Sequence, residues 1–473
     1  PNHTTTAMEK TSGNLKALAT RPIGRLLWEY SLPAVVGMVV MSLYNVVDRI
    51  FIGRGVGADA IAGLAITFPV TNVCTAIGVL IGAGAAARVS IMLGQKDYRG
   101  AQLVLGNSLV LILINAVIYL TFFAIFIDDI LMAFGASANT LPYARDFIVY
   151  LFPGMLVMNV MYSLNNVMRA TGYPAKSMIT ALISVVVNII LCPIFIFTLD
   201  WGIKGAALAT ICGQSVGALW VLAHFLSPKS FVRLRIRDSW FNKAIINRIY
   251  AIGLSPFLMN VCACVVVVFI NKALLDYGGT LGNMAIGAFG ILNRATMFFV
   301  MIVFGVTQGM QPILGFNYGA CQWQRVRNTL NTGIWIGLAI TTVGWIITEF
   351  FPDSISRLFT VDPTLIDMAN RGARIYFIVY PLVGCQIIIQ NYFQSVGKPK
   401  ISIFLSLTRQ LIFLLPFLFI LPRHWGIDGV WASMSASDAM AFVTAIITLI
   451  IMNRRQKRQL EQQTSPAEIS DQK

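Results

Sequence analysis

Long hydrophobic runs alternate with short polar segments along the whole chain. A helix needs about 20 apolar residues to cross a hydrocarbon core of about 30 Å, and most of the runs reach that length. Because backbone polar groups must be paired inside lipid, such runs predict membrane-spanning helices. We expect twelve spans, at residues 26–50, 60–83, 103–127, 146–168, 176–199, 204–226, 249–274, 284–310, 329–350, 373–394, 401–421 and 428–452.

The composition favours a polytopic, all-α membrane protein. Of the 473 residues, 57% are hydrophobic and 12% are charged, and the mean hydropathy is +0.73. A soluble domain has about twice that charged fraction. The formal net charge is +15, but the basic residues are dispersed between the hydrophobic runs. They predict membrane topology and not a phosphate-binding face, so nucleic acid is not expected as a partner.

Lysine and arginine gather in the loops that would share one side of the membrane, and such an excess marks the cytoplasmic side. The pattern predicts a multi-pass protein of the plasma (inner) membrane, in contact with lipid, with both termini in the cytoplasm. We expect it to be a monomer. Basic residues on that side include Arg21, Arg25, Lys96, Arg99, Arg325, Arg327, Lys398, Lys400, Arg454 and Arg455.

The two halves of the chain share short motifs in the same order. Residues 166–174 (NVMRATGYP) correspond to 391–399 (NYFQSVGKP), and residues 201–205 (WGIKG) correspond to 425–429 (WGIDG), at separations of about 220–225 residues. Halves of six spans each insert with the same orientation, so they are parallel repeats. The sequence therefore predicts two six-helix lobes related by a pseudo-two-fold axis, with a V-shaped central cleft suited to alternating access.

This duplication sets the expected domain organisation. A cytoplasmic N-terminal segment (1–25) precedes the N-terminal six-helix lobe (26–226). A basic cytoplasmic loop (227–248) then leads to the C-terminal six-helix lobe (249–452), and a cytoplasmic tail (453–473) follows.

The first span carries residues that are rare in membrane helices unless they have a structural or functional role. Pro33 removes a backbone donor and favours a kink. Gly37, Met41, Tyr44 and Asp48 share one helix face, at about 100° per residue. A membrane-inserted aspartate costs roughly 2.5–3.5 kcal/mol at the helix centre. Asp48 could mark the end of the helix at the interface, or it could face a cavity and bind a cation or a proton.

Several motifs in this chain resemble those of a known transporter family. They are Pro33 with Asp48, residues 169–172 (RATG), residues 188–197 (NIILCPIFIF) and residues 201–206 (WGIKGA). Together they resemble the multidrug and toxic compound extrusion (MATE) transporters, on the branch with the DinF-like and MepA-like proteins. The resemblance implies an antiporter, not an enzyme, that exports organic cations or drugs by alternating access in exchange for H⁺ or Na⁺.

The resemblance also implies which residues couple the ion to export. The family's N-terminal coupling site corresponds here to Asp48, Asn165, Asn188 and Thr210. The family motif in the fifth span usually ends in Asp-Pro, whereas this chain has Cys192 before its proline. A neutral thiol is a poor ligand for Na⁺, which prefers oxygen. This departure favours H⁺ and leaves Na⁺ open; no other cofactor or metal is expected.

Two further sets of residues are candidates. Thioethers and aromatic rings suit a site that accepts varied flat cations. The candidates for the substrate cleft are Met38, Met41, Tyr44, Asn45, Phe68, Met158, Tyr162, Met297 and Met301. Lone charges in lipid are costly, so we expect the buried charges of the C-terminal lobe to be paired, with gating or substrate exclusion as the alternative role. These charges are Arg294, Arg409 and Asp438.

Other functions remain as alternatives. A flippase for lipid-linked precursors has a related architecture and needs cationic residues for pyrophosphate, for which Arg49, Arg88 and Arg294 are available. A passive channel needs a filter-like loop or pore-lining repeats, and a membrane receptor usually has a sizeable domain outside the membrane; the sequence shows neither. It also has no Walker-type glycine loop and no CxxC pair, so neither ATP hydrolysis nor a zinc site is predicted.

Overall fold

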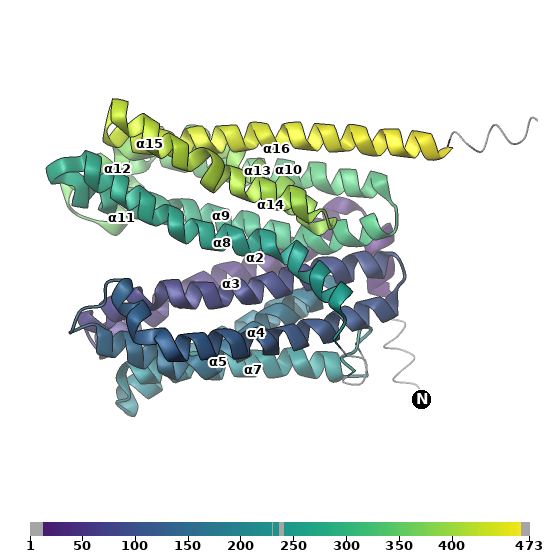
Figure 1. Ribbon diagram of the computed structural model, residues 1–473, viewed down its shortest axis with the longest axis horizontal. Helices are drawn as coiled ribbons and strands as arrows, with labels where there is room; N and C mark the ends of the chain where they lie inside the picture. Colours follow the sequence, from purple (N-terminus) through teal and green to yellow (C-terminus); the bar gives the residue numbers. More distant parts are fainter. Residues whose placement is uncertain (1–12, 229, 236–240, 465–473) are drawn as a thin grey trace, which may run out of the picture. The chain divides into compact units, whose positions relative to one another are not determined.

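The computed structural model describes residues 13–228, 230–235 and 241–464, and every regular element in these ranges is a helix (Figure 1). The predicted all-α class is therefore confirmed. The helices group into two compact units. Unit 1 comprises the described parts of Pro1–Val265, with Val300–Gly333 and Asn391–Ile403, and unit 2 comprises Val266–Phe299, Ile334–Gln390 and the described part of Phe404–Lys473. Portions of the predicted N-terminal segment, inter-lobe loop and tail lie outside the described residues.

Six long helices correspond to the first six predicted spans. A π-helical turn, η1 (Ile194–Thr198), extends the fifth of them. Most of these helices continue past the apolar runs, because polar residues can extend a helix beyond the hydrocarbon core. They are α2 (Ile23–Gly55), α3 (Ala58–Gly94), α4 (Tyr98–Ala133), α5 (Leu141–Ala170), α6 (Pro174–Pro193) and α7 (Gly202–Leu226).

The remaining elements follow from residue 243 onward. Short helices and π-helical turns interrupt the longer spans in this part of the chain. The elements are α8 (Lys243–Gly278), η3 (Gly279–Leu281), α9 (Gly282–Gly319), α10 (Trp323–Phe350), α11 (Pro352–Phe359), α12 (Pro363–Tyr376), α13 (Tyr380–Ser395), α14 (Pro399–Leu407), η4 (Thr408–Phe413), α15 (Leu414–Trp425) and α16 (Ile427–Thr464).

α8 and α9 form a helical hairpin. They and the short η3 cover 77 residues, which as one straight helix would extend about 115 Å. Instead, the start of α8 and the end of α9 both meet α3. A Cβ atom on Gly253 would collide with the backbone of Leu80, and one on Gly319 would collide with the backbone of Ile91. Gly279, at the turn, has a φ of +54°, which glycine adopts without strain.

The described residues account for the twelve predicted spans. Ten helical stretches are long and apolar enough to cross a membrane, and α12 with α13 makes an eleventh that is bent by 57°. Since one of the ten is the α8–α9 hairpin, it contributes two spans. The prediction of one unbroken helix over 373–394 is wrong, because the chain breaks between Tyr376 and Tyr380. Pro381 lacks the backbone donor that would continue the helix there.

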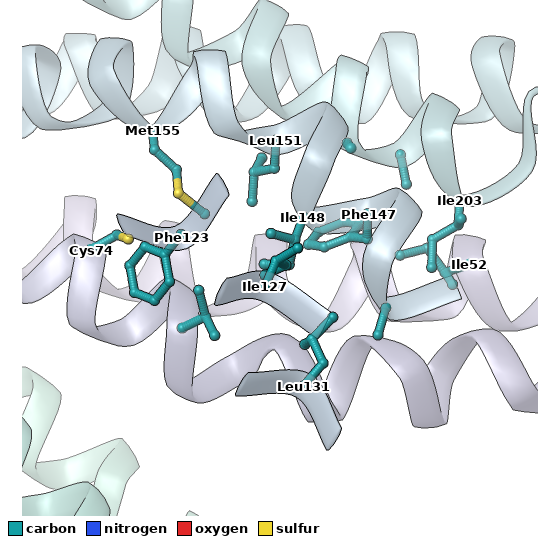
Figure 2. Close-up of a cluster of buried hydrophobic side chains, with 14 of the residues drawn as sticks. Ile52, Cys74, Phe123, Ile127, Leu131, Phe147, Ile148, Leu151, Met155 and Ile203 are labelled. Carbon is teal, nitrogen blue, oxygen red and sulfur yellow. The ribbon is translucent and has the colours of Figure 1, made fainter. Parts of the chain in front are cut away.

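A cluster of apolar side chains joins α2, α3, α4, α5 and α7 within unit 1 (Figure 2). Phe123 and Ile127 from α4 meet Phe147 and Ile148 from α5, and all four are buried. Lipid tails are as apolar as these side chains, so close packing and not exclusion of water holds helices together here. The cluster fixes the helices that carry the polar residues described below.

The predicted division into six and six helices remains a prediction. Parts of α8, α9, α10, α13 and α14 belong to unit 1 together with α2–α7. The units therefore do not coincide with the predicted lobes.

Candidate ion-coupling site

Asp48 is buried near the end of α2, with 8% of its surface exposed. Its Oδ1 atom accepts a hydrogen bond from the Sγ atom of Cys192, at the end of α6, over 3.3 Å. Cys192 is fully buried. The residue that departs from the family motif is thus the direct neighbour of the carboxyl group. Pro33 lies within α2, and the helix continues past it to Gly55.

One turn away, three polar side chains from α2, α6 and α7 form a hydrogen-bonded triangle. The hydroxyl groups of Tyr44 and Thr210 are 3.1 Å apart. The Nδ2 atom of Asn188 donates to Thr210 over 3.2 Å and to Tyr44 over 3.4 Å. Tyr44 and Asn188 each precede a member of the Asp48–Cys192 pair by four residues, so the pair and the triangle line the same faces of α2 and α6.

Asn165, the fourth predicted coupling residue, lies apart from this cluster. Its Nδ2 atom donates to the backbone oxygen of Ser177 over 3.2 Å. Ser177 precedes Asn188 by 11 residues, which is about 16 Å along a helix. The structure therefore joins three of the four predicted residues and places Asn165 beside Arg169, which donates to the Ser177 hydroxyl over 3.2 Å.

The predicted substrate-cleft residues differ in exposure. Tyr44 is buried in the polar triangle. Asn45, Phe68 and Met297 are exposed, and Asn45 donates to the backbone oxygen of Met41 in its own helix. The remaining candidates are half-buried, and their role in binding stays a prediction; they are Met38, Met41, Met158, Tyr162 and Met301.

The charged residues predicted to be buried in the C-terminal lobe differ in their burial. The Nε atom of Arg409 lies 2.6 Å from Oδ1 of Asp438, and both side chains are largely buried. Arg294, in contrast, is exposed, and its guanidinium carbon is 5.8 Å from the centre of the Phe359 ring. The expectation that Arg294 is buried is wrong, because the buried face of α9 passes through positions 291, 292, 295 and 296, and position 294 lies outside it.

The separation of Asn165 from the triangle leads to a first prediction. Replacing Asn188 with alanine removes a donor to two hydroxyl groups, and losing one partner of a buried hydrogen bond costs about 1–3 kcal/mol. We expect Asn188→Ala to weaken ion-coupled export roughly tenfold and Asn165→Ala to weaken it much less. Initial rates of fluorescent-cation efflux from vesicles measure both. Equal losses in the two variants would contradict the placement.

The described residues are helical, hold twelve apolar spans and bury a carboxyl group among polar side chains, which is the architecture of a membrane transporter. The chain belongs to the MatE family. The family model matches residues 33–194 and again residues 251–420, and this double match supports the predicted internal duplication. The protein is thus a multi-pass membrane transporter and not an enzyme.

The comparisons with individual proteins agree with the family. Multidrug export protein MepA of Staphylococcus haemolyticus (strain JCSC1435) is 29% identical over 437 residues, covering 91% of this chain and 94% of that protein. MepA of Staphylococcus aureus (strain MSSA476) is 27% identical over 434 residues, covering 92% and 95%. A crystal structure of MATE in complex with MaL6 has a TM-score of 0.87 at 23% identity, over 93% of this chain and 99% of that one; this likeness shows the fold.

Proposed function

We propose that this protein is a secondary antiporter of the plasma (inner) membrane that exports organic cations or drugs in exchange for H⁺, with both termini in the cytoplasm. The observation that carries the proposal is the buried carboxyl group of Asp48, which forms no ion pair with any described residue. The MepA relatives, which are named as multidrug export proteins, support the substrate class.

A carboxyl group in this position can couple the movement of a proton to the movement of an organic cation through its charge. Ionised Asp48 places a negative charge in a largely apolar region, where an uncompensated charge is costly. A proton or a bound organic cation each relieves that cost, so the two compete for the same group. Uptake of a proton from outside then releases the drug, and loss of the proton to the cytoplasm restores the site.

The side chains around Asp48 offer few free oxygen ligands, which favours H⁺ over Na⁺. Na⁺ needs several oxygen ligands, by the logic that governs other hard cations. Cys192 donates a hydrogen bond from its thiol to Asp48 and offers no oxygen. The oxygens of Tyr44 and Thr210 already accept hydrogen bonds from Asn188. A proton needs one carboxyl group only.

Proteoliposomes with separately imposed gradients test this function. We expect a pH gradient to drive efflux of a fluorescent organic cation in the absence of Na⁺. A passive channel would dissipate the gradient without accumulating the dye. Na⁺-driven efflux at equal pH on both sides and zero membrane potential would overturn the choice of H⁺.

A second prediction concerns the thiol. Cys192→Asp supplies carboxylate oxygens next to Asp48, so we expect it to create or strengthen Na⁺ dependence in the same assay. Cys192→Ser is the matched control, because it changes the sulfur to oxygen without adding an acid, and we expect its efflux to remain driven by the pH gradient. A Cys192→Asp protein with no response to Na⁺ would count against the argument from ligands.

A further inference from the structure

We propose that the packing of α9 against α2, α3 and α5 within unit 1 is a separable closure, locked by Gln308 and Arg169 and strapped by residues 13–21. In the antiporter proposed above, on which this assignment to the transport cycle rests, opening the closure gives cytoplasmic substrate access to the protein. Three features of the molecule support it: the close packing at this contact, the chemistry of its buried arginine and the position of the N-terminal segment.

The contact is made by glycines on one side of α9. Gly305 and Gly309 face α2: a Cβ atom on Gly309 would lie 2.6 Å from the Ser31 nitrogen, and one on Gly305 would lie 2.7 Å from the Val35 Cα atom. Gly315 faces α3 in the same way, with 2.6 Å to the Ser90 Cβ atom. Both glycine pairs of α9, 305 with 309 and 315 with 319, have the G-x-x-x-G spacing that lets helix backbones touch.

Close backbone contact of this kind favours association of the helices. Whether the contact parts therefore depends on how strongly its polar groups hold it. Two hydrogen bonds accompany the packing. The hydroxyl of Ser31 donates to the backbone oxygen of Val306 over 3.4 Å, and Nε2 of Gln311 donates to the backbone oxygen of Ala83 over 3.1 Å.

Arg169 provides the lock, although it has no acidic partner. Only 7% of its surface is exposed, and its Nη1 atom donates to Oε1 of Gln308 over 2.5 Å. Its other side-chain partners are the neutral Asn166 and Ser177, and none of the described ion pairs includes it. A buried ion pair would be costly to separate at this depth. A hydrogen bond from arginine to an amide is weaker, so this contact can reopen.

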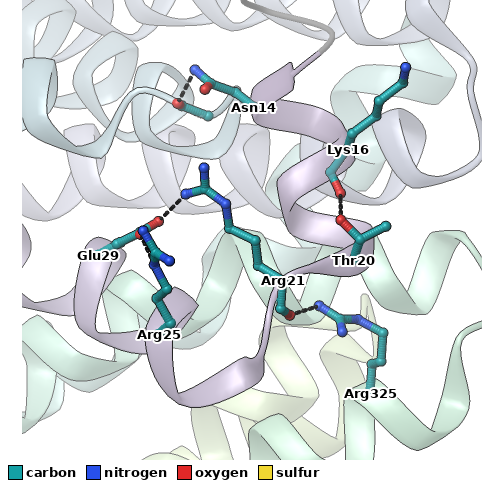
Figure 3. Close-up of polar contacts among 8 residues, drawn as sticks. Asn14, Lys16, Thr20, Arg21, Arg25, Glu29 and Arg325 are labelled. Carbon is teal, nitrogen blue, oxygen red and sulfur yellow. Dashed lines mark hydrogen bonds and ion pairs between the residues drawn. The ribbon is translucent and has the colours of Figure 1, made fainter.

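The N-terminal segment runs across the end of the same contact. Residues 13–20 form a short helix. Asn14 donates through Nδ2 to the backbone oxygen of Gly172, in the turn between α5 and α6, over 3.1 Å. At its other end, Arg325 of α10 donates to the backbone oxygens of Leu18 and Arg21 over 2.9 and 2.8 Å; Figure 3 shows the Arg21 contact.

The strap is anchored at both ends by specific groups. Asn317 of α9 also donates to the Leu18 oxygen over 3.2 Å, and its own Oδ1 accepts from Nε of Arg325 over 3.0 Å. The Leu18 side chain is fully buried. The segment therefore connects the α5–α6 turn with the α9–α10 turn, which are the two sides that must part if the closure opens.

The test is the reactivity of a cysteine inside the contact, measured on the purified full-length protein in lipid nanodiscs. Ser31→Cys places a thiol against Gly309, and mass spectrometry follows its modification by a maleimide. Against this background we expect Gln308→Ala and Arg325→Ala to speed labelling on the order of tenfold. Gln308→Ala removes the acceptor of the charged Arg169, and Arg325→Ala removes a charged donor to Leu18, Arg21 and Asn317. Gln308→Glu supplies the missing carboxylate, so we expect it to slow labelling below the parent rate.

Two controls separate opening from general loosening. Native Cys74 is fully buried in the apolar cluster of unit 1, and its labelling should not change. Gln324→Glu makes the same chemical change at an exposed position of α10 and should leave the Ser31→Cys rate unaltered. Labelling at parent rate in both alanine variants, acceleration by Gln308→Glu, or equal acceleration at Cys74 would overturn the proposal. The assay uses neither a drug nor an ion gradient, so its result is independent of whether the protein is an H⁺ antiporter.

Discussion

Replacing Asp48 with asparagine will abolish gradient-driven export while leaving the protein folded. The amide keeps the size of the side chain and can still accept from Cys192, whose Sγ is 3.3 Å from Oδ1 in the parent. It cannot ionise, so it resembles the protonated carboxyl group permanently. The site then no longer alternates between a charged form that favours an organic cation and a neutral form that favours release. We expect efflux at the level of cells that lack the protein.

Export of an ethidium-like dye from energised cells, with the amount of membrane-inserted protein measured in parallel, checks this result. Asp146→Asn is a matched control, because Asp146 is a half-buried acid that lies 3.4 Å from Lys204 at a helix surface. It should export at the parent rate. If Asp48→Asn protects cells as well as the parent does, Asp48 is not the coupling group and the proposed mechanism fails.

Most of the fold could be predicted because the membrane imposes a simple rule. A span must be apolar and long, so the hydropathy pattern alone predicts twelve spans. The pattern predicts the ends of the helices less accurately. α4 runs from Tyr98 to Ala133, well past the apolar run at 103–127, because no energetic penalty ends a helix in the polar region. The break before α13 depends on Pro381 in its local context, which hydropathy does not detect.

The site was predictable only in part, for a physical reason. Periodicity places Tyr44 and Asp48 on one face of α2, and the same spacing relates Asn188 to Cys192. It cannot show which face of α2 meets which face of α6, so it predicts Tyr44 in the cleft and not in the triangle with Asn188 and Thr210. Asn165 is a candidate by family resemblance alone, and its place beside Ser177 depends on tertiary packing.

The lock between Arg169 and Gln308 was not predicted, although its signals were present in the sequence. Gly305, Gly309, Gly315 and Gly319 form two G-x-x-x-G pairs, which are a known sign of close helix contact. An arginine at the end of a predicted span, however, resembles any topology-determining residue. Only the distance of 2.5 Å to Gln308 distinguishes this one.

The other large effect should be a loss of stability when the Arg409–Asp438 pair is broken. The two groups are 2.6 Å apart, and their side chains are 19% and 7% exposed. Breaking a buried pair by removing one partner costs about 3–5 kcal/mol, because the other charge remains buried and uncompensated. Asp438→Asn should therefore lower the thermal unfolding temperature of the purified protein strongly. Native tryptophan fluorescence during heating in detergent measures it.

Two further variants show whether the cost comes from the lone charge. In Arg409→Leu with Asp438→Leu both charges are gone, and replacing a buried pair by apolar residues is often neutral or stabilising, so most of the loss should be recovered. Asp353→Asn breaks the Arg357–Asp353 pair, whose side chains are 69% and 52% exposed, and exposed pairs contribute about 0–1 kcal/mol. A small effect of Asp438→Asn, comparable to that of Asp353→Asn, would mean that water or lipid headgroups reach Arg409 and that the pair does not hold unit 2 together.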